Sequence, residues 1–255
     1  MIKVIKAEFM KNIKRKDILA MLLISILLPF LVTYLTNSGS VVKSPLKTPL
    51  ENTFVIAFFM GTMLFPLLSI VCSANTLSRE IENGSIRLIL AKPVNRQQIF
   101  IAKFIILLCL CLVGLIFTFL SSYFSGILFF GLKKAPLLSR NGNVLIPIWK
   151  DILFTYILGF LGLLFCSSIT LFISCYFQPS VSILVPLIIL IFSQALESKK
   201  QLRYFLPTYL YQFSSTGLYS NEPIKEGLIN MAILAVYIVL LLIFGIIHFE
   251  RKDFV

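Results

Sequence analysis

A charged segment between two apolar runs carries the residue types best suited to specific contacts with a partner. Ser78–Phe104 reads SREIENGSIRLILAKPVNRQQIFIAKF and holds two Glu, three Arg, two Lys, one Gly and one Pro around a short apolar patch, IRLIL. A plain connector between two membrane spans needs neither charges of both signs nor an apolar patch. The length and pattern of this segment therefore favour a docking element.

The middle of this segment predicts a short helix with a turn at each end. Asn83-Gly84 is a turn signal, and Ser85–Ala91 is long enough for about two helical turns. Pro93 ends the helix because proline disfavours helical geometry in the residue before it. A surface loop lying on lipid headgroups is the alternative, and the pattern alone leaves both open. One apolar face of the helix would be formed by Ile86, Ile89 and Leu90.

The sequence lacks recognisable catalytic groups. No predicted span has a charged residue at its centre, although proton-coupled carriers and pumps usually need one. The single histidine, His248, stands at the end of an apolar run, none of the five cysteines forms a CxxC pair, and no GxxxxGK[ST] phosphate loop is present. We therefore expect a chain that is not an enzyme, holds no metal or cofactor, and takes any energy for uphill transport from another protein.

The composition indicates a polytopic membrane protein. Of the 255 residues, 58% are hydrophobic and only 13% are charged, whereas soluble domains carry about 25% charged residues. The mean hydropathy is +0.94. The net charge of +12 suits anionic lipid better than nucleic acid, because no aromatic-interleaved basic patch is available to stack bases.

Six apolar runs are long enough to cross a bilayer, which takes about 20 residues. The expected fold class is therefore an all-α membrane protein with six transmembrane helices. The third run, as one helix of roughly 30 residues, would reach about 45 Å, so it either extends into the cytosol at its start or breaks near Ser121–Ser122. The six runs are Ile18–Leu35, Phe54–Asn75, Phe100–Phe130, Ile152–Phe177, Val181–Leu196 and Leu228–His248.

Lysine and arginine set the predicted orientation. Thirteen of them lie in the N-terminus, in the segment after the second span and in the C-terminus, and ten lie on the other side. The N-terminal group is the densest, so both termini and Ser78–Phe104 are predicted to be cytosolic.

The chain is expected to form a single membrane domain over residues 1–255. Residues 1–16 would form an amphipathic interfacial helix, residues 18–248 the six-span bundle and residues 249–255 a cytosolic tail. In the first of these parts, basic residues lie opposite an apolar stripe, as in helices that lie in the headgroup plane. A simple topology signal is the alternative. The apolar stripe consists of Ile2, Ile5, Phe9 and Ile13.

Residues within the spans suggest hinges and a substrate path. Pro66 and Pro186 are candidate hinges, with static kinks as the alternative, since membrane helices tolerate proline where neighbouring groups satisfy the freed backbone. An apolar path with scattered polar groups suits a hydrophobic or amphipathic substrate better than an ion. The candidate lining residues are Phe58, Phe59, Phe65, Ser69, Ser73 and Asn75.

The charged segment resembles the cytosolic loop of type-2 ATP-binding-cassette (ABC) permeases. Members of this family typically show an acidic pair, a Gly, an apolar helix, a Pro-x-x-Arg turn and a Lys that opens the third span. The N-terminal helix with Glu8 resembles the family's connecting helix, and FERKDF (Phe249–Phe254) resembles its charged terminus, so the resemblance covers the whole chain. The matching positions are Glu80, Glu82, Gly84, Ile86–Leu90, Pro93, Arg96 and Lys103.

The resemblance implies a subunit of an ATP-driven exporter. Two permease halves, identical or related, would pair with two copies of a separate ATPase in a bacterial plasma membrane, and ATP and Mg²⁺ would bind to the ATPase. Ile86, Ile89 and Leu90 would fill a groove of the ATPase. Arg87 and Arg96 would pair with its acidic rim or with headgroups, and Glu80 and Glu82 would face its basic groups or cap the coupling helix.

Two other functions remain open from the sequence. The first is a permease-like sensor, immunity or scaffold protein that binds an ATPase without net transport. The second is an ion-coupled carrier, which the lack of charge at the centres of the spans disfavours. The expected substrate class includes antimicrobial or cytolytic peptides, while the identity of the substrate and of the second permease is left undetermined.

Overall fold

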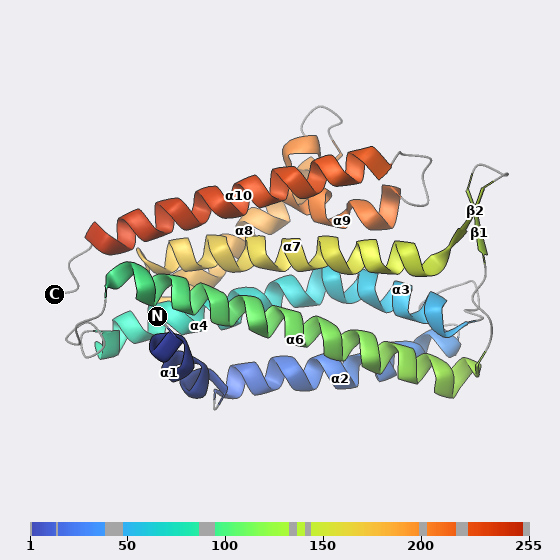
Figure 1. Cartoon of the computed structure of the whole chain (residues 1–255), viewed down its shortest axis with the longest axis horizontal. Helices are drawn as coiled ribbons and strands as arrows, with labels where there is room; N and C mark the ends of the chain where they lie inside the picture. Colours follow the sequence, from blue (N-terminus) through green and yellow to red (C-terminus); the bar gives the residue numbers. More distant parts are fainter. Residues whose placement is uncertain are drawn as a thin grey trace.

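The computed structural model describes residues 2–13, 15–38, 48–86, 95–132, 137–140, 144–198, 203–217 and 224–251. Long helices lie side by side along one common direction (Figure 1). Within the described residues, five helices are long and apolar enough to cross a membrane. They are α2 (Lys16–Asn37), α6 (Arg96–Phe130), α7 (Ile148–Ser174), α8 (Pro179–Leu196) and α10 (Ile224–Arg251).

The predicted second span, Phe54–Asn75, is divided into three consecutive helical stretches. These are α3 (Pro49–Phe59), a π-helical turn over Met60–Leu64, and α4 (Phe65–Glu82). The Phe65 backbone N–H donates to the carbonyl of Met60, five residues back. The widened turn stands directly before Pro66, whose ring has no N–H to donate and would clash with a carbonyl of a regular α-helix.

The start of α3 is defined by its capping residues. The Thr48 hydroxyl accepts a hydrogen bond from the Glu51 N–H at 3.3 Å, and the Glu51 carboxylate accepts one from the Thr48 N–H at 3.1 Å. Such a capping box satisfies two backbone donors that a helix start leaves unpaired.

Helix α6 is continuous over its 35 residues. Of the two alternatives predicted for this run, the break near Ser121–Ser122 is wrong, because the helix continues through both residues. Their hydroxyls donate to carbonyls three residues back, of Thr118 and Phe119. At 1.5 Å per residue α6 is about 52 Å long, well beyond a hydrocarbon core of about 30 Å.

Two small features depart from the arrangement of long helices. The strands β1 (Leu137–Arg140) and β2 (Val144–Pro147) pair antiparallel, with Leu137 opposite Pro147, and they are the exception to the predicted all-α class. A 3₁₀ turn (Arg203–Phe205) and α9 (Pro207–Gly217) follow α8. Helix α9 packs closely on α7, since a Cβ added at Gly162 would lie 2.7 Å from Cγ of Tyr211.

The ends of the bundle differ in what they contain. The short helix α1 (Ile2–Ile13), the last turn of α4, the first turn of α6 and the last turn of α10 lie together, and we name this the α1 end (Figure 1). The β-strands lie at the opposite end, the hairpin end. Residues 87–94, which connect α4 toward α6, lie outside the described residues.

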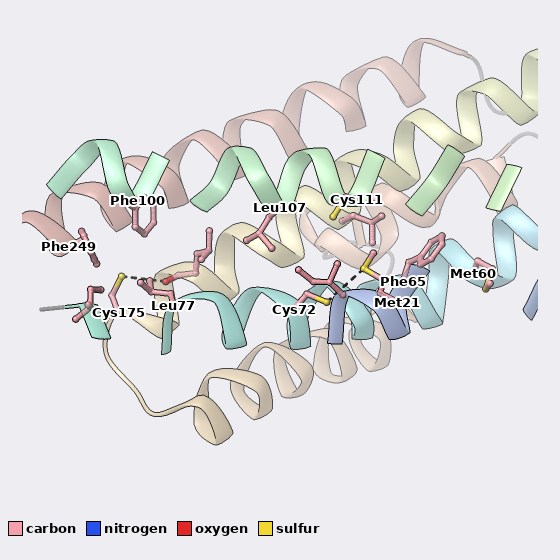
Figure 2. Close-up of a cluster of buried hydrophobic side chains, with 14 of the residues drawn as sticks. Met21, Met60, Phe65, Cys72, Leu77, Phe100, Leu107, Cys111, Cys175 and Phe249 are labelled. Atoms are coloured by element: carbon pink, nitrogen blue, oxygen red, sulfur yellow. Dashed lines mark hydrogen bonds between the residues drawn. The ribbon is translucent and has the colours of Figure 1, made fainter. Parts of the chain in front are cut away.

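The largest core cluster extends inward from the α1 end. Figure 2 shows Phe100, Phe249, Leu77 and Cys175 at one side of this cluster and Met60 and Phe65 at the other. All five cysteines are free, and four of them are buried. The Cys72 thiol, for example, lies 3.9 Å from the sulfur of Met21 on α2. The cysteines therefore act as small apolar packing residues.

Candidate coupling site

Four charged side chains from three helices form an ion network at the α1 end, in which Lys103, Glu80 and Glu8 are buried and Lys11 is 45% exposed. The Lys103 ammonium on α6 lies 2.6 Å from Oε2 of Glu80 on α4 and 3.4 Å from Oε2 of Glu8 on α1. It also donates to the Thr76 carbonyl at 3.1 Å. The Lys11 ammonium lies 2.6 Å from the other oxygen of Glu80. Two carboxylates thus balance two ammonium groups.

Burial makes this network different from ordinary surface ion pairs. The Lys103 side chain is 0% exposed and that of Glu80 is 8% exposed. Removing one member of a buried pair leaves an uncompensated charge and costs about 3–5 kcal/mol. The network therefore ties α1, α4 and α6 to one another at their shared end.

The pKa of Glu80 reflects the same surroundings. Burial alone would raise the pKa of its carboxyl. Attraction to Lys103, together with hydrogen bonds from Lys103 and Lys11, outweighs burial and holds the pKa below its ordinary value. Glu80 is therefore an anion at neutral pH.

A second cluster of polar side chains joins the start of α2 to α4. Nη2 of Arg15 lies 2.8 Å from Oδ2 of Asp17, and Nη1 of Arg15 donates to the Thr76 hydroxyl at 3.3 Å. The amide of Asn75 donates to the same Asp17 carboxylate at 3.2 Å. Thr76 thus connects the two groups, because its carbonyl accepts from Lys103 and its hydroxyl accepts from Arg15.

The first turn of α6 is held by α10. Arg96 donates to the backbone carbonyl of Glu250 at 3.1 Å, and the Gln97 amide donates to the Glu250 carboxylate at 2.9 Å. One turn further on, the Phe100 and Phe249 rings lie 5.7 Å apart, and both are buried. The segment between α4 and α6 is therefore anchored on its entry side by the ion network and on its exit side by α10.

The structure locates part of the predicted docking segment. Ile86 is 1% exposed and belongs to the main core cluster, so its side chain packs inside this chain instead of on an exposed face. Gly84 has φ +66°, a backbone conformation that glycine adopts without strain, which confirms the predicted turn. Glu82 is exposed. The remaining predicted residues Arg87, Ile89, Leu90 and Pro93 lie outside the described residues.

Glu80 and Arg96 have partners within the chain. Glu80 was predicted to face an ATPase or to cap the coupling helix, and in the structure both of its oxygens bind lysines of this chain. Arg96 was predicted to pair with an acidic rim or with headgroups, and one of its nitrogens donates to the α10 carbonyl of Glu250. Both residues therefore position the segment from within.

The candidate path residues do not gather around one cavity. Phe58 and Phe59 on α3 are each 40% exposed, whereas Phe65 is 1% exposed and part of the core. The buried Ser69 and Ser73 hydroxyls donate to carbonyls of their own helix, and Asn75 binds Asp17. Only the two exposed phenylalanines lie on an open surface of the chain.

The candidate hinge prolines are both buried. Pro66 follows the π turn at the start of α4, and Pro186 lies inside α8. A third proline within a helix, Pro29 of α2, was not predicted as a hinge although it is equally buried. The π turn before Pro66 is the irregularity that a hinge would use.

The N-terminal helix faces the bundle through polar residues. Glu8 and Asn12 are 5% and 2% exposed, whereas Phe9 of the predicted apolar stripe is 47% exposed and Met10 is 60% exposed. The Asn12 amide donates to the Glu8 carbonyl at 2.9 Å. The spacing of Glu8, Lys11 and Asn12 on one helical face is a sequence signal from which this contact could have been predicted.

A bundle with several apolar helices of spanning length and a charged network at one end defines a multi-pass membrane protein without a recognisable catalytic centre in its described part. A family model described as "ABC-2 family transporter protein" matches residues 2–254. The chain belongs to this family. Members of this family are typically non-catalytic membrane permeases of ABC transporters that partner with an ATPase subunit.

A curated relative has a similar sequence over part of its length. The uncharacterized protein YhcI of Bacillus subtilis (strain 168) is 24% identical over 206 residues, which are 75% of this chain and 65% of the relative. The chain thus spans less than two thirds of the length of that relative.

Proposed function

We propose that this permease moves a hydrophobic or amphipathic substrate out of a bacterial cell, driven by a separate ATPase that docks on residues 83–95. The observation that carries the proposal is the double anchoring of this segment. On its entry side Glu80 binds lysines of α1 and α6, and on its exit side Arg96 and Gln97 bind Glu250 of α10. A segment held on both sides transmits a displacement to the helices that hold it.

The proposed topology has six crossings with both termini in the cytosol. Five crossings are the long apolar helices, and residues 49–82, which comprise α3, the π turn and α4, add one more as the second span in the sequence. At 1.5 Å per residue this segment reaches about 50 Å. The ion network supports an α1 end outside the hydrocarbon core, because its charged side chains are costly to place deep in hydrocarbon. The dense Lys and Arg residues of the N-terminus support the cytosolic side for that end.

The proposed mechanism begins on the partner. Two ATPase copies bind ATP and Mg²⁺, and closure of their dimer moves the docking segments of two permease chains, identical or related. Because Glu80 and Lys103 are paired, α4 and α6 move together, and α1 follows through Glu8 and Lys11. The π turn before Pro66 lets α3 tilt against α4.

The substrate path is proposed to pass the exposed phenylalanines of α3. Phe58 and Phe59 lie next to the π turn, so a change at this turn alters the surface that they present. Large aromatic side chains contribute much of the apolar contact area at binding surfaces, which suits a hydrophobic compound or an amphipathic peptide, including an antimicrobial one.

The test is ATP hydrolysis by the permease co-purified with its ATPase in lipid vesicles. Ile89→Asp with Leu90→Asp should abolish co-purification. Leu132→Asp places the same charge at the hairpin end on a side chain that is 82% exposed, and it should leave the complex intact. Equal binding by the double variant and the wild type would show that the segment is not the dock. A complex whose ATP hydrolysis no exported compound stimulates would favour a sensor or immunity role.

A further inference from the structure

An apolar groove that plays no part in the coupling site runs between α6 and α7, and Leu50 of α3 also lines it. Its cavity volume is about 580 Å³. Leucine and isoleucine side chains form most of the wall. Four rings complete it, those of Phe119, Trp149, Tyr156 and Phe160. Helices α6 and α7 lie beside one another over this region (Figure 1).

The groove opens away from the rest of the chain. Its rim on α6 includes Ile116 and Leu120, which are 49% and 55% exposed. Its rim on α7 includes Leu153 and Ile157, which are 55% and 43% exposed. Since both helices have the length and apolar character of membrane spans, the mouth of the groove faces the hydrocarbon of the bilayer.

The length of the groove corresponds to one leaflet. On α7 its lining residues extend from Trp149 to Phe160, a distance of about 17 Å along the helix at 1.5 Å per residue. The full hydrocarbon core is about 30 Å thick. Trp149 is in the first turn of α7, at the hairpin end, and tryptophan is enriched where a span meets the headgroups. The groove therefore starts at that interface and ends near the bilayer midplane.

The chemistry of the wall limits what can fill the groove. Apolar cavities of about 150 Å³ stay free of water and bind small hydrocarbons. A larger apolar groove that faces a membrane is therefore filled best by a hydrocarbon chain. A peptide segment at this depth brings backbone donors and acceptors that must be satisfied. The polar side-chain groups on the wall are the Tyr156 hydroxyl and the Trp149 indole N–H, too few to satisfy the backbone of a peptide. An acyl chain has no hydrogen-bonding groups to satisfy.

We propose that this groove is a binding site for one acyl chain of a phospholipid from the leaflet at the hairpin end. The headgroup lies beside Trp149, and the chain extends along α7 toward Phe160. The bound chain braces α6 against α7. The proposal does not depend on the direction of transport or on the docking segment.

The single tryptophan of the chain provides the measurement. The full-length protein in maltoside micelles is titrated with phosphatidylglycerol brominated in the upper half of its acyl chains, because bromine quenches tryptophan fluorescence on contact. We expect quenching of Trp149 to saturate at a single lipid per chain.

Two variants that fill the groove test whether the quenching reports this site. Leu115→Phe fills the groove from a half-buried position on α6, and Ile157→Phe fills it from the exposed rim on α7. Overpacking of this kind should weaken lipid binding roughly tenfold. Leu240→Phe makes a similar change on an exposed α10 residue outside the groove and should bind lipid as the wild type does. Far-UV circular dichroism and the size-exclusion elution profile show whether each variant folds. If Leu115→Phe does not fold, the lipid binding of Ile157→Phe decides the outcome.

Two results would overturn the proposal. Quenching that rises without saturation, to the same extent in all four proteins, would mean ordinary contact with bulk lipid. Absence of quenching, together with disulfide cross-linking between chains that carry Leu153→Cys, would mean that a second copy covers the groove.

Discussion

The Lys103 ammonium of α6 lies 2.6 Å from the Glu80 carboxylate of α4, with the lysine side chain fully buried. The two residues are 23 positions apart, on either side of the segment proposed to dock an ATPase. Their pairing makes the last turn of α4 and the early turns of α6 one mechanical unit. Glu8 and Lys11 extend that unit to α1.

Loss of the Lys103 charge should destabilise the protein strongly. Lys103→Met leaves Glu8 and Glu80 opposite Lys11 alone, and breaking a buried pair costs about 3–5 kcal/mol. The melting temperature in detergent measures the effect. Adding Glu80→Leu should recover much of the loss, because the two side chains interact directly. Additive losses in the double variant would contradict a direct pairing.

Acid should weaken the α1 end through Glu80. Because the folded-state pKa of Glu80 lies below the ordinary value of a glutamate carboxyl, its contribution to stability is complete at pH values above that ordinary value and is lost as the pH falls through the lowered pKa. Lys11→Met removes one of the groups that lower the pKa, so the loss should begin at a higher pH. Melting temperatures between neutral pH and about pH 3 test this shift, and identical profiles for the two proteins would refute it.

Two glycines of α7 offer a matched pair of substitutions. Gly162→Ala should destabilise the packing of α9 by about 1–3 kcal/mol, since the new Cβ would lie 2.7 Å from Cγ and 2.8 Å from Cβ of Tyr211. Gly159→Ala meets nothing within 4 Å and should stabilise the helix by somewhat less than about 1 kcal/mol. Thermal unfolding compares them, and equal effects would show that α9 does not approach α7 this closely.

Substitutions of the phenylalanines in the predicted second span should have two different effects, one on stability and one on stimulated ATP hydrolysis. Phe65→Ala removes a core side chain and should cost about 3–5 kcal/mol of stability. Phe58→Ala and Phe59→Ala change side chains that are 40% exposed, so they should cost little stability. If these two residues line the path, they should instead change stimulation of ATP hydrolysis by the transported compound. Unchanged stimulation in both would exclude them from the path.

The turn chemistry and the approximate spans were predictable from local sequence. Gly84 adopts the positive φ expected after Asn83. Four predicted runs are covered by α2, α6, α8 and α10, whereas α7 ends at Ser174, three residues before the predicted end at Phe177. The π turn before Pro66 was not predicted, because a proline in an apolar run signals a disturbance without stating how neighbouring carbonyls rearrange. The β-strands were also missed, since each is only four residues long and neither carries an alternating pattern of apolar and polar residues.

The buried side of each helix could not be read in the same way. Several spans are apolar around their whole circumference, so periodicity does not distinguish a lipid-facing side from a packed one. Phe58 and Phe65 therefore looked equivalent, although one is exposed and the other is in the core. Ile86 looked like part of an exposed patch because its burial depends on helices distant in sequence.

The sequence by itself determined that the chain is a membrane protein with a charged segment between two spans, because transfer of apolar side chains out of water depends on each local stretch. It also determined the family, through motifs distributed along the chain. The tertiary structure alone decided that Glu80, Lys103, Glu8 and Lys11 neutralise one another and that α6 and α7 enclose an apolar groove. Ion pairs and grooves depend on distances between helices, and those distances are set by packing.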